Sequence, residues 1–156
     1  MTPIPLGILD FPTGAAGAYD LLETATITSS SSWSFTGLDT LAADYQHLQL
    51  RMVIGVNSAS SSNPTQYIRL NNDSGSNYAW HALSGDGSSV TSDNGTTQTY
   101  IRLNDSIGGD AAGGIFGAVV LDILDFASTN KNTTIRGLWG AVNTSEKDIF
   151  LGSGVY

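Results

Sequence analysis

The sequence predicts an all-β protein, an antiparallel β-sandwich of the jelly-roll type that follows an extended N-terminal arm. Short stretches alternate between apolar and polar residues, and turns rich in glycine, asparagine and serine separate them. The composition is also poor in helix-forming residues, since glutamate is nearly absent. A chain of 156 residues has the length of about one domain. We therefore expect an arm over residues 1–17 and a single β-sandwich domain over residues 18–156.

The arm combines apolar side chains with residues that prevent regular secondary structure. Pro3, Pro5 and Pro12 exclude a regular helix and disfavour a central strand. Leaving a large apolar side chain in water forfeits about 1.5 to 3 kcal/mol relative to full burial. We expect the arm to make assembly contacts on a neighbouring subunit, with its own domain as the alternative surface. The expected contact residues are Ile4, Leu6, Ile8, Leu9 and Phe11.

Nine strands are predicted after the arm, and two of them have clear patterns. In residues 47–56 every second residue is apolar, which indicates a strand with one buried face. In residues 115–124 both faces are apolar apart from Asp122, which indicates that both are covered. The predicted strands are 19–28, 33–36, 47–56, 66–71, 77–84, 98–104, 115–124, 133–142 and 148–151. Turns are expected at 60–64, 73–75, 84–87 and 93–95.

The pentapeptide Tyr-Ile-Arg-Leu-Asn occurs twice, at residues 67–71 and 100–104. In each copy Ile and Leu share one face of a strand, while Tyr, Arg and Asn share the other. The residues that follow the two copies differ at once, so a repeat architecture is not indicated. We interpret the copies as two similar strands whose Tyr and Arg pair across a sheet surface. The alternative is a pair that recognises a ligand.

Residues suited to catalysis are few. His47 and His81 are the only histidines, and both fit structural or surface roles. Asp122 and Asp125 are three residues apart, which places them on opposite faces of a strand and makes an acid/base pair unfavourable unless the strand ends between them. Asp125 is better placed to begin the turn at residues 125–130. The sequence therefore does not indicate an enzyme.

Metal and cofactor sites have equally little support. Residues 71–77 show the alternating oxygen ligands of a calcium loop, but Ala82 stands where such a loop needs a bidentate Glu. A turn explains the same residues. The glycine-rich stretch 108–114 lacks the Lys of a phosphate loop. We expect no cofactor and no metal.

The charge balance limits the kinds of partner. Fourteen acidic residues against six Lys and Arg give a formal net charge of −8, which repels phosphate backbones and anionic bilayers. The N-terminal residues lack the basic start of a signal peptide, and no apolar run is long enough to span a membrane. We expect a soluble protein made in a cytoplasm, with neither nucleic acid nor membrane as its partner.

Aromatic residues offer one candidate for recognition at the surface. Tyr78, Trp80 and Trp139, with Trp33, could form a platform on which a sugar ring stacks. Aromatic side chains in a β-sandwich also fill cores and interfaces, so both interpretations stay open.

Several segments resemble a family of virion structural proteins of tailed bacteriophages. The resemblance covers most of the chain from about Gly17 onward and keeps the order and spacing of the matching segments. It implies a β-sandwich that decorates a capsid or belongs to a tail or fibre, and it brings no catalytic residues. The matching segments are 19–24, 45–51, 69–81 with 85–87, 115–117, 121–125, 129–131 and 135–136. Similar proteins continue with a further strand after the position of residues 152–156, so either this chain is short or its sandwich is completed differently. A missing strand would leave an open sheet edge that a partner could fill.

These observations give two hypotheses. The first is a capsid decoration or cement protein, located in the virion, that binds the major capsid protein or other virion proteins through its arm and sheet edges. We expect a homo-oligomer, with a trimer as the expected state. The alternative is a tail-fibre or receptor-binding module that contacts a host glycan. A hydrolase would need a carboxylate pair that the sequence does not supply.

Overall fold

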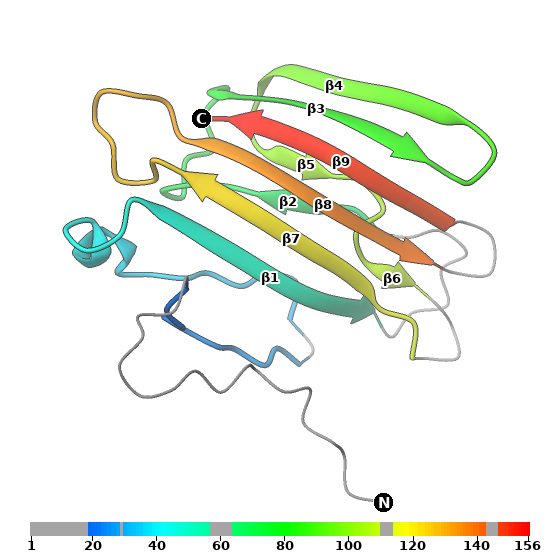
Figure 1. Cartoon of the computed structure of the whole chain (residues 1–156), viewed down its shortest axis with the longest axis horizontal. Coiled ribbons are helices and arrows are strands. Elements are labelled where there is room, and N and C mark those ends of the chain that lie inside the picture. The colour runs from blue at the N-terminus through cyan, green and yellow to red at the C-terminus, as the bar shows by residue number, and fades with distance from the viewer. Residues whose placement is uncertain (1–18, 29, 57–63, 110–113, 143–146) are drawn as a thin grey trace, which may run out of the picture. The chain divides into compact units, whose positions relative to one another are not determined.

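The computed structural model describes residues 19–28, 30–56, 64–109, 114–142 and 147–156 (Figure 1). The chain divides into two compact units, Met1–Thr36 and Gly37–Tyr156. The described residues of the first unit form neither strand nor helix, so the strands predicted at 19–28 and 33–36 are wrong. Leu21 and Leu22 are adjacent, and this breaks the alternation that a one-sided strand needs. The predicted arm, residues 1–17, lies outside the described residues.

The second unit contains one large sheet with the strand order β4-β3-β9-β8-β7-β1-β6 (Figure 1). Its neighbours pair antiparallel, except for the short parallel pairing of β6 with β1. The all-β, mostly antiparallel class that the sequence predicts is therefore confirmed. The strands of this sheet are β1 (His47–Val56), β3 (Tyr78–Gly85), β4 (Val90–Gln98), β6 (Gly108–Gly109), β7 (Gly117–Leu124), β8 (Thr134–Val142) and β9 (Lys147–Val155).

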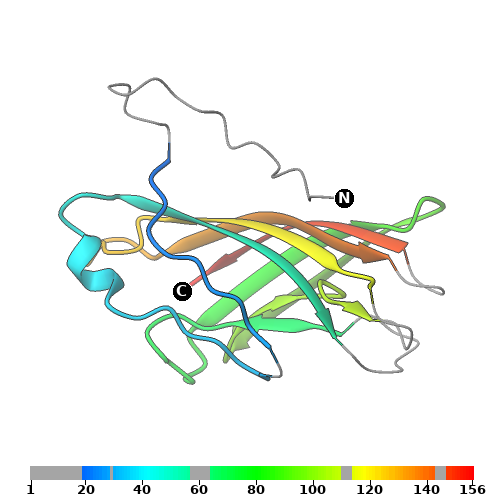
Figure 2. The same cartoon turned by 90° about the horizontal axis from the view of Figure 1, so that it is seen from below.

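A second, two-stranded sheet is formed by β2 (Gln66–Ile68) and β5 (Ile101–Leu103). Figure 2 shows this pair on one side of the large sheet. A short 3-10 helix, η1 (Leu38–Leu41), precedes β1.

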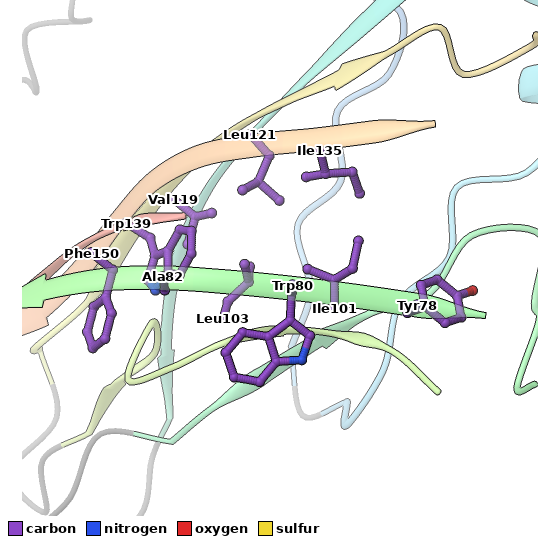
Figure 3. Packing of buried hydrophobic residues seen from close by; sticks show 10 residues of the cluster. All are labelled: Tyr78, Trp80, Ala82, Ile101, Leu103, Val119, Leu121, Ile135, Trp139 and Phe150. Carbon is purple, nitrogen blue, oxygen red and sulfur yellow. The ribbon is translucent and has the colours of Figure 1, made fainter. Parts of the chain in front are cut away.

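The core lies between β5 and the face of the large sheet that is turned toward it (Figure 3). Its side chains come from alternate positions of their strands, as a pleated sheet with one buried face requires. The rings of Trp139 and Phe150 stack with centroids 5.7 Å apart. The core residues are Tyr78, Trp80, Ala82, Ile101, Leu103, Val119, Leu121, Ile135, Trp139 and Phe150.

Strand β4 replaces the turn predicted at 93–95. The chain turns earlier, where the Asp86 carboxylate accepts hydrogen bonds from the backbone amides of Ser88 and Ser89, both at 2.7 Å. Gly95 pairs with Trp80, and a Cβ on Gly95 would meet the indole Nε1 at 2.7 Å. The Asn-Gly pair therefore provides room for an indole ring rather than a hairpin turn.

Strand β9 continues through residues 152–155 and lies between β3 and β8. Gly154 pairs with Trp80 on one side and with Ile135 on the other. Strand β9 therefore does not itself form an edge of the sheet. Gly-Ser-Gly suggests a loop, but a Cβ on Gly154 would meet the Ile101 side chain at 2.7 Å, so this glycine allows β9 to approach β5.

Candidate assembly surface on the outer face of the sheet

The outer face is the side of the large sheet turned away from β2 and β5. Registered residues of neighbouring strands point to the same side, so rows of side chains can be followed from strand to strand. One row consists of Leu83 on β3, Leu151 on β9, Leu138 on β8 and Val120 on β7. These side chains are between 40% (Val120) and 60% (Leu151) exposed.

A second apolar row runs beside the first. It begins with Val90 on β4 and ends with Val53 on β1, which are 77% and 75% exposed. Exposed Ile149 lies in the middle of this row. Small residues occupy the other positions of this row. In order, the full row is Val90, Gly85, Ile149, Gly140, Ala118 and Val53. The two rows, called the apolar rows below, form a continuous exposed apolar surface across β3, β9, β8 and β7.

A polar row borders the apolar rows and holds a hydrogen-bond network. The Asp122 carboxylate accepts hydrogen bonds from Gln49 Nε2 at 2.8 Å and from Arg136 Nε at 3.2 Å. Arg51 Nε donates to Gln49 Oε1 at 2.6 Å. The hydrogen bond from Gln49, followed by the hydrogen bond and charge of Arg136, holds the pKa of Asp122 below its ordinary value.

The charge of the outer face differs in sign from that of the chain. Arg51, Arg136 and Lys147 occupy outward positions, and Asp122 is the acidic residue at the registered outward positions. Three positive charges and one negative charge give this face a formal charge of +2, whereas the whole chain carries −8. The outer face is therefore both apolar and basic.

Sequence reasoning missed most of the outer face, although a signal was present. Residues 115–124 are apolar on both faces, and we expected both to be covered. The structure leaves the outward Phe116 and Val120 exposed, so that expectation is wrong for the chain by itself. Ile149, Phe150 and Leu151 are three consecutive apolar residues, so at least one of them must face outward on a strand. Apolar residues on both faces of neighbouring strands were the signal for this surface.

The described part of the first unit exposes further apolar side chains. Leu21 is 81% exposed and Trp33 is 51% exposed. The same unit carries Asp20 and Glu23, and no Lys or Arg precedes Arg51 in the sequence. The expected assembly residues Ile4, Leu6, Ile8, Leu9 and Phe11 lie outside the described residues.

Tyr78, Trp80 and Trp139 do not form a recognition platform at the surface. All three are buried in the core cluster (Figure 3), so that prediction is wrong and the core interpretation holds. Trp139 Nε1 donates to the backbone carbonyl of Asn104 at 2.8 Å. Burial raises the pKa of Tyr78, whose hydroxyl lies 3.0 Å from both the amide and the carbonyl of Leu70.

The two copies of Tyr-Ile-Arg-Leu-Asn lie side by side. Strands β2 and β5 pair so that Ile68 faces Ile101 and Tyr67 faces Arg102. The predicted pairing of Tyr with Arg across a sheet surface is therefore confirmed. Because equivalent isoleucines pair, the two copies are related by a local two-fold axis. The rings of Tyr67 and Tyr100 lie 4.3 Å apart.

The arginines of these copies already have protein partners. Arg69 Nε donates to the carbonyl of Thr99 at 3.0 Å. Arg102 Nη1 lies 3.7 Å from Asp93 Oδ2 on β4. The groups that strands β2 and β5 leave available at the surface are therefore mainly the tyrosine rings.

The remaining polar residues form turns and strand ends. The Asp73 carboxylate accepts hydrogen bonds from the Gly75 amide at 2.6 Å and Asn77 Nδ2 at 2.7 Å, as expected for a turn. His47 Nδ1 accepts a hydrogen bond from the Asp125 amide at 3.0 Å. Asp125 begins the turn after β7 with a left-handed φ of 55° and pairs with Lys131 at 3.5 Å. In the described part of the chain, His, Asp and Glu side chains do not gather in threes as metal ligands would.

Asp44, Asp125 and Lys131 contribute to the lining of an open hollow of about 390 Å³. Because Asp125 and Lys131 pair with each other, their charges are largely satisfied inside the protein. The hollow therefore has a weaker claim to a binding role than the outer face.

Comparison with protein-family models, with curated proteins and with solved structures gives no match. Among the described residues, no helix has the length and apolar character needed to cross a membrane.

Proposed function

We propose that this chain is a structural protein of a bacteriophage virion, most specifically a capsid decoration or cement protein. The observation that carries the proposal is the outer face, where the apolar rows hold seven large exposed apolar side chains on one side of an antiparallel sheet. The opposite face of that sheet already holds the core, and such a sheet normally turns polar side chains to water. A contiguous exposed apolar surface of this kind is typical of a protein interface.

The resemblance of many segments to tailed-phage structural proteins supplies the biological context. In this proposal the outer face and the N-terminal residues bind the major capsid protein, other virion proteins or sister copies, and the assembled form is a homo-oligomer, with a trimer as the expected state. The jelly-roll-like sandwich belongs to the same proposal, with β2 and β5 as the part of the second layer among the described strands.

The test is to locate the protein on intact particles of the source phage by cryo-electron microscopy and to measure its binding to stripped particles. We expect density on the head lattice. Replacing Leu138 and Leu151 together by Glu should abolish binding, because charged groups would be buried in the contact. Tyr67→Glu is the matched control, since Tyr67 is similarly exposed but lies on β2. Full binding by the double variant, or density on the tail alone, would refute the decoration role.

A second candidate, a tail-fibre or receptor-binding module that contacts host glycan, has one observation in its favour. Tyr67 is 56% exposed, and its ring adjoins that of Tyr100. Neighbouring aromatic rings suit sugar stacking. A specific glycan-array signal that Tyr67→Ala removes would support this function, whereas a signal unchanged in Tyr67→Ala would exclude the tyrosine pair as its site.

A further inference from the structure

We infer that the outer face binds the N-terminal segment, residues 1–36, of a second copy of this chain. This inference concerns contacts between copies and stands or falls independently of a role in a virion. It rests on the described residues 19–28 and 30–36 of the segment and on the apolar rows of the sheet.

Both surfaces are apolar and exposed. Leu21, Leu22, Ile27 and Trp33 are exposed in the segment, and Leu83, Leu138, Leu151 and Ile149 are exposed on the outer face. Burying apolar surface of this kind is the main driving force of association. A contact between the two sets would remove both from water.

The charges of the two surfaces are complementary. The described part of the segment contains Asp20 and Glu23 with no Lys or Arg, so its side chains carry a formal charge of −2. The outer face carries +2 from Arg51, Arg136 and Lys147 against Asp122. Packing two outer faces together would bring like charges into contact, whereas the segment brings opposite charges. The segment is therefore the better occupant than a second outer face.

The segment is also long enough to span the outer face. Its described residues form no helix and no sheet ladder. Six antiparallel strands about 4.8 Å apart make a face about 24 Å wide. An extended chain advances about 3.3 Å per residue, so eight residues cross that width. Residues 19–36 are long enough to lie over both apolar rows.

Each copy would then provide one segment and one outer face. Two copies can exchange segments reciprocally, and more copies can close a ring in which each segment lies on the next face. Both arrangements leave no apolar row unoccupied.

The experiment is a complementation test with two full-length variants. The face variant carries Leu138→Glu and Leu151→Glu, and the segment variant carries Leu21→Lys and Trp33→Lys. The glutamates of the face variant repel the acidic segment, and the lysines of the segment variant repel the basic outer face. Analytical ultracentrifugation of either variant by itself should show self-association weakened by about 100-fold or more. An equimolar mixture should form a one-to-one heterodimer, because one variant keeps an intact segment and the other an intact face.

Three results would overturn the inference. Wild-type protein could stay monomeric up to about 1 mM, the weak end of specific association. The segment variant could self-associate like the wild type, which would indicate pairing of two outer faces. The mixture could fail to form the heterodimer although both variants keep the far-ultraviolet circular dichroism of the wild type, which would place the segment on its own chain.

A crosslinking test covers the case in which a variant fails to fold. The chain contains no cysteine, so single cysteines can be placed freely. Thr24→Cys and Ser153→Cys variants, mixed and treated with a short bismaleimide, should give a product with one copy of each. Tyr67→Cys replaces Ser153→Cys as the control and should not crosslink with Thr24→Cys. Equal yields from both mixtures would refute the contact.

Discussion

Gly152 shows how a residue without a side chain fixes the packing of this core. A Cβ at this position would collide with the Trp139 ring, which stacks on Phe150. The indole occupies the space that a side chain would need, so the glycine serves packing and not a turn. The same holds for Gly95 beneath Trp80.

Gly152→Ala should therefore destabilise the protein by about 2 kcal/mol, because the collision displaces Trp139 from its stacked position. Urea denaturation monitored by tryptophan fluorescence measures the change. Gly85→Ala is the matched control on the same sheet, since its Cβ would only meet Ser89 O at the ordinary contact distance of 3.8 Å. Equal stability of the two variants would contradict the packing described here.

Asp122 joins three strands through its contacts with Gln49 and Arg136. Its pKa is lowered in the folded state, so its ionised form stabilises the fold above the unfolded pKa of about 3.9, and this contribution is lost as the pH falls through the folded pKa. Asp122→Asn should lower stability by about 0.5 kcal/mol near pH 7, a small value because the site is partly solvated.

Thermal unfolding of Asp122→Asn and wild-type protein across pH 2 to 7 measures this effect. The difference should shrink as the pH falls below about 3.9, because the wild-type carboxyl then takes up a proton. Asp39→Asn, in the exposed helix η1, controls for the loss of one negative charge. A difference that persists at the acidic end would mean that Asp122 acts through something other than its charge.

At the scale of strands, clear alternation in the sequence predicted the structure well. Residues 47–56 form β1 with the predicted bounds, since one face of this strand is apolar and the other polar. Strand β4 was missed because it has almost no apolar residues, and its pairing with β3 comes from the tertiary structure. The end of β9 was missed because Gly152 and Gly154 resemble turn residues in the sequence. Only the structure shows that the side chains of Trp139 and Ile101 need the space that these glycines leave.

The outer face could be predicted only in part for a related reason. Alternation shows which positions of a strand share a face, but it does not show which strands are neighbours. The row from Leu83 to Val120 exists only because β9 enters between β3 and β8. No spacing in the sequence brings these residues together.

The repeated pentapeptide gives a test of the element that covers the core. Ile101 on β5 is 2% exposed, whereas the side chain of Tyr67 on β2 is exposed. Ile101→Ala should cost about 2 to 4 kcal/mol through the cavity that it leaves. Tyr67→Ala should cost less than about 1 kcal/mol. Chemical denaturation measures both, and a smaller loss for Ile101→Ala than for Tyr67→Ala would mean that β5 does not close the core.

At the scale of the whole molecule, charge is distributed unevenly. The chain carries −8, and the outer face carries a positive charge. Copies therefore repel one another in general, while one face attracts acidic surfaces. This arrangement favours a single mode of contact over unspecific aggregation.

Lys147→Glu should consequently weaken self-association by about three- to tenfold more than Lys131→Glu. Both variants change the net charge equally. Lys147 lies on the outer face, whereas Lys131 lies in the loop between β7 and β8 and pairs with Asp125. Sedimentation equilibrium measures both dissociation constants, and the difference should shrink at about 0.5 M NaCl because salt screens exposed charges. Identical behaviour of the two variants would show that this face has no role in association.

The central place of β9 has a consequence for synthesis on the ribosome. Until residues 147–155 emerge, the β3–β4 hairpin shares no ladder with the paired strands β1, β7 and β8, since only β9 pairs with both β3 and β8. A nascent chain stalled before this point would hold two half-sheets with bare edges, exposed to proteases and chaperones. Completion of the sheet is thus delayed until translation has passed β9, and the outer-face surface that spans β3, β9 and β8 comes into existence only then.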